Sequence, residues 1–200
     1  MEDRPIFSDQ FKAVYGRPIE FFLSGGHKST IGREEIFHDT HEEHDEWIKQ
    51  SFSPTLVENL TDSRSRYEDE MATPVGVRES IIKFRSNPHA VATGDPLRTA
   101  RQIMALDNEL RTNSRPNPTP LYRGARRSPV TDATANRPLS FSENRHVAGH
   151  FAKFSRGEIF KVGKEEVRGL RMEDYGVKPM TIGPSQLSEA EWLVDPRSLP

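Results

Sequence analysis

The chain has 200 residues, which at roughly 150 residues per domain indicates one domain, or one domain with an attached segment. No run approaches the roughly 18 apolar residues of a membrane span, and the absence of cysteine excludes disulfides, thiolate metal sites and cysteine nucleophiles. The net charge of −2 conceals an asymmetry, because residues 1–100 carry 12 Lys or Arg against 18 Asp or Glu, whereas residues 101–200 carry 16 against 12. The second half therefore suits a small anionic ligand, and its modest positive charge does not predict a nucleic-acid partner.

The first half of the chain is predicted to be mainly helical. Apolar residues recur at helical spacing among acids between Ser29 and about Gln50, which predicts an amphipathic helix. A second helix is predicted from Pro54 to about Met71, with Leu56, Val57 and Leu60 facing inward. We therefore expect a mainly helical N-terminal part over residues 1–94.

Asp95 followed by Pro96 is a strong helix start, because the carboxylate caps the first turn and proline fits the first helical position. We expect this helix to cover residues 95–112. Short extended segments then dominate, at Leu121–Ala125, Pro138–Ser142, Glu158–Val162 and Glu189–Val194. One helix interrupts them; it begins after Ser142, its expected N-cap, and is predicted to bury Val147, Phe151 and Phe154. The sequence therefore predicts an α+β fold with a second domain over residues 95–200.

Three motifs in the second half carry chemistry-bearing side chains on predicted strands. Arg123 precedes Gly124, whose lack of a side chain permits close approach to the backbone. Ser140 and Ser142 share one strand face, opposite the face of the residue between them. Glu189 and Glu191 likewise share a face, where proximity of like charges raises at least one carboxyl pKa and favours a cationic partner.

In this order, Arg123, Ser140-Phe141-Ser142 and Glu189-x-Glu191 resemble the R-S-E signature of mono-ADP-ribosyltransferases. The resemblance covers about residues 119–196. It implies a split β-sandwich with NAD bound in the cleft between two sheets. It also implies transfer of ADP-ribose to an arginine of a target protein, as in toxin- or phage-type members with Glu-x-Glu. The implied reaction needs no metal.

The resemblance assigns NAD binding to four residues. Arg123 would pair with an NAD phosphate through its planar fork, and Gly124 would offer backbone groups to the nicotinamide amide. Ser140 would hydrogen-bond near the nicotinamide ribose, and Ser142 would support the corner between strand and helix.

The catalytic roles implied by the resemblance fall on Glu191, Glu189 and Ser140. Glu191 would bind the ribose 2′-hydroxyl and stabilise the positive charge that develops as nicotinamide leaves. Glu189 would orient the incoming guanidinium and help to take its proton. Ser140 would hold Glu191.

Two other functions stay open at this point. One is that of a non-enzymatic structural or interaction protein of a phage or toxin that keeps the fold, because a fold does not fix a function. An NAD glycohydrolase would use water as the acceptor instead of arginine.

The first residues, Met1-Glu2-Asp3-Arg4, lack the basic and apolar regions of a secretory signal, so we expect a soluble protein. A cytoplasmic location, delivery as an effector and association with a virion are all compatible with this expectation.

Histidines form two further groups. His38, His41 and His44 lie in the acidic segment, but the spacing of three between His41 and His44 does not match the four-residue spacing of zinc proteases. His146 and His150 are four apart without acidic or cysteine partners in register. We expect the first group to form a solvated face and the second to be structural, and we expect no metal site.

Overall fold

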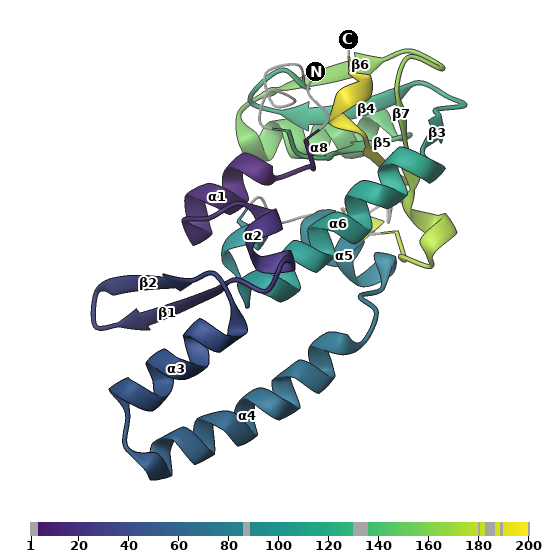
Figure 1. The fold of residues 1–200 in the computed structure, drawn as a ribbon. Coiled ribbons are helices and arrows are strands. Elements are labelled where there is room, and N and C mark those ends of the chain that lie inside the picture. The colour runs from purple at the N-terminus through teal and green to yellow at the C-terminus, as the bar shows by residue number, and fades with distance from the viewer. Residues whose placement is uncertain are drawn as a thin grey trace.

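A computed structural model describes residues 4–85, 89–129, 136–179, 181–182, 187–188 and 190–199 (Figure 1). Helices and strands both contribute substantially, so the predicted α+β class is confirmed. The described strands form one six-stranded sheet and two two-stranded sheets. The split β-sandwich of the ADP-ribosyltransferases stays a prediction. None of the helices in the described ranges is both long and apolar enough to cross a membrane.

The first half of the chain contains most of the helices. Its elements are α1 (Ser8–Tyr15), α2 (Ile19–Leu23), β1 (His27–Ile31), β2 (Glu34–His38), α3 (His41–Ser51), α4 (Pro54–Ala72), α5 (Val77–Arg85) and η1 (Ala90–Ala92).

Strands β1 and β2 form an antiparallel hairpin where the sequence predicts the first half of a helix, so that prediction is wrong for residues 29–38. Gly32 has a φ of +62° and opens a two-residue turn between Ile31 and Glu34. Glycine at the first position of such a turn matches the twist of the paired strands. The helical part is α3, where the Thr40 hydroxyl accepts a hydrogen bond from the backbone N–H of Glu43 at 3.2 Å.

The hairpin, α3 and α4 project from the rest of the molecule, and we call residues 27–72 the arm (Figure 1). The predicted helix over residues 54–71 is confirmed as α4. The predicted burial of Leu56 and Leu60 is wrong, because both side chains are exposed. Within α4 only Met71 is buried, and α3 has no buried residue, so the arm has little core of its own.

The second half begins with α6, as predicted. It comprises α6 (Pro96–Asn113), β3 (Arg115–Pro116), β4 (Leu121–Ala125), β5 (Leu139–Ser142), α8 (Arg145–Ser155), β6 (Glu158–Val162), β7 (Arg168–Arg171), η2 (Met172–Tyr175), β8 (Thr181–Ile182), β9 (Leu187–Ser188), β10 (Glu191–Val194) and η3 (Pro196–Ser198). The Asp95 carboxylate caps α6 by accepting a hydrogen bond from the backbone N–H of Arg98 at 3.0 Å. The predicted strands β4 and β6 are confirmed at both ends.

The main sheet has the strand order β3-β7-β10-β5-β4-β6. Side chains alternate across β10, so that Leu193 packs into one core with the helices and Trp192 packs into a second core on the opposite face. The first core combines the sheet with α1, α2, α5 and α6, and therefore draws on residues from both sides of position 94. Strand β10 is buried along its whole length because both of its faces are covered.

Helix α8 packs on β4 and begins after Asn144, whose side chain accepts a hydrogen bond from the N–H of His146 at 2.9 Å, so the predicted cap at Ser142 is wrong. Val147 is buried as predicted. The predicted burial of Phe151 and Phe154 is wrong, and Phe154 is 78% exposed. The helix turns its small residues toward the sheet instead, which leaves the two phenyl rings outside.

Candidate active site

The main sheet brings three of the predicted site residues together. Arg123 is on β4, Ser140 on β5 and Glu191 on β10, and these three strands are neighbours in the sheet. The register pairs Ser142 with Tyr122 on one side and with Glu191 on the other. Ser140 and Glu191, 51 positions apart along the chain, thereby lie on adjacent strands.

A chain of hydrogen bonds connects the three side chains. Arg123 Nη1 donates to the backbone carbonyl of Ser140 at 2.9 Å. Ser140 Oγ donates to Glu191 Oε1 at 2.5 Å. The Ser140 hydroxyl thus holds one carboxylate oxygen of Glu191, and the Arg123 guanidinium holds the strand that carries Ser140. The positions of the three side chains are therefore coupled.

Glu191 is 5% exposed, and burial raises the pKa of its carboxyl group. The hydrogen bond from Ser140 and the positive charge of Arg85 act in the opposite direction and lower the pKa. Arg85 Nη1 lies 3.6 Å from Glu191 Oε2. The site therefore holds a buried carboxyl group whose pKa is raised by burial, with a hydrogen bond from Ser140 and the charge of Arg85 opposing that rise.

Arg85 is a site residue that the sequence analysis missed. It is the last residue of α5, in the part of the chain predicted to be separate from the sheet. No local motif surrounds it, and its contact with Glu191 spans 106 positions of sequence. Only the packing of α5 against the helical face of the sheet reveals it.

Gly124 is required by the packing of α8. A Cβ atom at this position would lie 1.9 Å from the backbone oxygen of Ala148 and 2.4 Å from the backbone nitrogen of Ala152. Any side chain here would displace the helix. Gly124 therefore has a structural role, which is to leave room for the backbone of α8. Its predicted role in binding the nicotinamide amide stays a prediction.

Ser142 lies at the corner between β5 and α8. It is buried, and its Oγ accepts a hydrogen bond from the backbone N–H of Asn144 at 3.0 Å. The next residue, Glu143, accepts a hydrogen bond from Trp192 Nε1 at 2.7 Å, which ties the corner to β10. Glu189, the other predicted catalytic carboxylate, lies outside the described residues.

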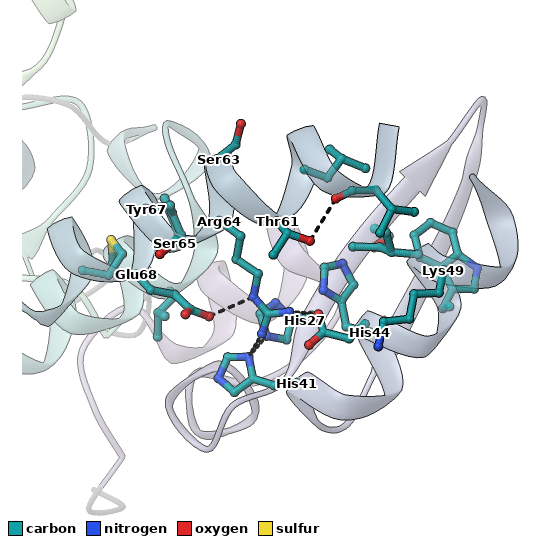
Figure 2. Close-up of a pocket in the computed structure, with 18 of the residues that line it drawn as sticks. His27, His41, His44, Lys49, Thr61, Ser63, Arg64, Ser65, Tyr67 and Glu68 are labelled. Atoms are coloured by element: carbon teal, nitrogen blue, oxygen red, sulfur yellow. Dashed lines mark hydrogen bonds and ion pairs between the residues drawn. The ribbon is translucent and has the colours of Figure 1, made fainter. Parts of the chain in front are cut away.

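The arm brings histidines together that are distant in sequence. Figure 2 shows His27, His41 and His44 around Arg64, which is also paired with Glu68. His27 Nε2 and His41 Nδ1 are hydrogen-bonded, and the rings of His27 and His44 stack with centroids 4.6 Å apart. The prediction of a solvated histidine face is wrong for His38, which is buried because the hairpin packs against α3.

Burial and neighbouring positive charge lower the pKa of His27 and of His44 to about 4. Within the described ranges, no group of three His, Asp or Glu side chains is arranged to hold a metal ion. His146 and His150 lie apart from this cluster, on α8, and line a separate cavity of about 390 Å³.

Comparisons of this chain with protein-family models, with curated proteins and with solved structures found no match.

Proposed function

We propose that this protein is an NAD-dependent mono-ADP-ribosyltransferase that modifies an arginine of a target protein. The observation that carries the proposal is the contact chain from Arg123 through Ser140 to the buried carboxylate of Glu191. A guanidinium, a hydroxyl and a carboxylate at one point of a sheet match the groups that the R-S-E resemblance requires.

The residues present suit NAD as a substrate. Arg123 carries a planar fork that can bind a phosphate in two places, and its bond to the Ser140 carbonyl fixes the direction of that fork. Ser140 holds the carboxylate that would bind the ribose 2′-hydroxyl. In the charged form, Glu191 stabilises the positive charge that develops on the ribose.

In the proposed reaction the bond between ribose C1′ and the nicotinamide nitrogen breaks, and its electron pair leaves with nicotinamide. A bond then forms between C1′ and a guanidinium nitrogen of the acceptor arginine. That nitrogen gives up one proton, for which Glu189 is the proposed acceptor. Atoms and charge balance without an external oxidant or reductant.

The decisive experiment measures nicotinamide release and protein labelling with tagged NAD. We expect Glu191→Gln to lower nicotinamide release by about 100-fold or more, because a preorganised charge of this kind contributes roughly 10²–10³ to the rate. Glu158→Gln, at an exposed glutamate of β6, is the matched control and should retain the wild-type rate. Unchanged release in Glu191→Gln contradicts the proposal.

The same experiment separates the alternatives. A glycohydrolase would release nicotinamide without labelling any protein, and its Glu189→Gln variant would still release nicotinamide. A protein that only retains the fold would release no nicotinamide, and its melting temperature would not rise with NAD. We expect NAD to raise the melting temperature of the wild type, by linkage with binding to the folded form, and to do so less for Arg123→Lys.

A further inference from the structure

The arm encloses a cavity of about 980 Å³ between β1, α3 and α4, which we call the arm groove (Figure 2). Its apolar walls come from all three elements and are formed by Ile31, Trp47, Ile48, Phe52, Val57 and Leu60. The volume is at the upper end of the roughly 300–1,000 Å³ that ligand sites occupy. The groove is therefore large enough for several side chains of a partner.

The apolar walls of the arm groove are left open to solvent. Ile31 is 46% exposed and Leu60 is 36% exposed. Leu56, one helical turn before Leu60 on α4, extends the exposed apolar surface. Amphipathic helices gain most of their stability by burying such a stripe, so α3 and α4 carry apolar surface that the described residues do not cover.

The arm as a whole is strongly acidic. Residues 33–70 carry twelve Asp or Glu and only four Lys or Arg. All of these acids except Asp45 are exposed. One of the four cations, Arg64, is paired with Asp45 and Glu68 inside the groove. A partner that brings positive charge to the arm gains attraction, and a partner that brings negative charge is repelled.

We infer that the arm groove binds an amphipathic helix of a partner protein, with apolar side chains in the groove and Lys or Arg along the flanks of the helix. Helix-in-groove recognition places apolar anchors at i, i+3, i+4 and i+7, which fits a cavity whose apolar walls come partly from two helices. The inference goes beyond the proposed NAD chemistry and does not depend on it, because no residue of the active site lines the groove. The negative charge of the arm disfavours two other occupants, a second copy of this arm and an anionic lipid surface.

The test uses the intact chain and three synthetic peptides of roughly 18 residues, about five helical turns. The first has leucines on one helical face and lysines elsewhere. The second has glutamate in place of every lysine, and the third has the composition of the first in an order that disperses the leucines. Fluorescence anisotropy of the labelled peptides gives each dissociation constant. We expect the first peptide to bind at least about ten-fold more tightly than either of the others.

Variants locate the binding. Ile31→Ser combined with Leu60→Ser should weaken binding of the first peptide by about ten-fold or more. Ile82→Ser is the matched control, because Ile82 is also 46% exposed but lies on α5 outside the groove, and it should bind like the wild type. All three positions are exposed, so these variants should fold normally, which circular dichroism checks.

Several outcomes overturn the inference. Equal binding of the ordered and dispersed lysine peptides would indicate non-specific attraction to an acidic protein. Equal binding of the glutamate peptide, or tight binding of vesicles rich in phosphatidylserine, would show that the arm does not select basic partners. Wild-type affinity in the double variant would place the peptide elsewhere. A dimer in light scattering that dissociates in the double variant, with no peptide binding, would assign the groove to a second copy.

Discussion

At the scale of single residues, Gly124 sets the distance between the sheet and α8. The backbone of α8 occupies the space that any side chain at position 124 would need. This approach places α8 directly over β4, the strand that carries Arg123. A change at Gly124 therefore acts on the site through the helix.

We predict that Gly124→Ala lowers the free energy of unfolding by roughly 3 kcal/mol, at the upper end of the cost of overpacking, because the new methyl group meets backbone atoms. Gly149→Ala is the matched control within α8, where the nearest atom to the new methyl is Ile159 Cδ1 at 3.5 Å. It should raise stability by about 0.5–1 kcal/mol, as expected for a glycine in a helix. Urea denaturation measures both, and equal stability of the two variants contradicts this account of Gly124.

Arg85 is predicted to control the pH dependence of the proposed reaction through Glu191. Because burial raises the pKa of Glu191, nicotinamide release should fall, as the pH is lowered, at a higher pH than an ordinary glutamate would give. Removing the Arg85 charge raises this pKa further, so the acidic limb of the pH profile should move to higher pH in Arg85→Gln. Arg78→Gln, on the same helix but bonded to the carbonyl of Gly176, should leave the limb in place. An unmoved limb in Arg85→Gln shows that Arg85 does not act on Glu191.

At the scale of secondary-structure elements, local signals predict helix starts and strands well. The caps and prolines at Asp95-Pro96 and Pro54 act within one turn, and the starts of α6 and α4 follow them. The hairpin β1–β2 also had a local signal, Gly32 between two short segments, but the acidic residues and apolar spacing of the whole stretch favoured a helix. The predictions fail where the answer depends on distant partners, as for Phe154, because sequence periodicity does not show which face another element covers.

The histidine cluster is predicted to make the arm less stable in acid. The folded pKa of His27 and His44 is about 4, below the ordinary 6.5, so the unfolded chain binds more protons between these values. Their contribution to stability is therefore fully present above about pH 6.5 and is lost as the pH falls from 6.5 toward 4.

Thermal melting followed by circular dichroism tests this. Between pH 7 and pH 5, the melting temperature of the wild type should fall further than that of the double variant His27→Gln/His44→Gln, since the linkage begins to act as the pH falls below about 6.5. Parallel pH dependence in the two proteins would mean that other groups determine the acid sensitivity.

At the scale of the whole molecule, one apolar core joins the helices of the first half to the sheet of the second. Side chains from before position 94, including Phe11, Phe22 and Ile81, pack in the same cluster as Leu170 and Leu193. The sequence predicted the elements on both sides but not this shared core, because periodicity identifies apolar faces without pairing them. Because sequence periodicity does not show which elements pack together, it could not predict that Arg85 lies beside Glu191. Arg123, Ser140 and Glu191 were predicted as a set from their motifs.

The shared core predicts that residues 95–200 do not fold stably alone. Each buried Phe or Ile that the fragment lacks contributes about 1.5–3 kcal/mol, and several such losses exceed the roughly 5–15 kcal/mol that stabilises a typical domain. The fragment should therefore lack the cooperative thermal transition of the intact chain in calorimetry. A cooperative transition at the same temperature would instead support the predicted domain boundary at position 94.

Strand β10 has a further consequence for the order in which the protein assembles. It lies in the interior of the main sheet, between β5 and β7, yet it follows all the other strands of that sheet along the chain. A ribosome releases Arg123 and Ser140 well before Glu191, so the nascent polypeptide carries two incomplete half-sheets. Long-range pairing of this kind is slow compared with the formation of local helices. The proposed catalytic carboxylate thus reaches its place after Arg123 and Ser140, and under the proposed function a chain synthesised only as far as β7 would not consume NAD.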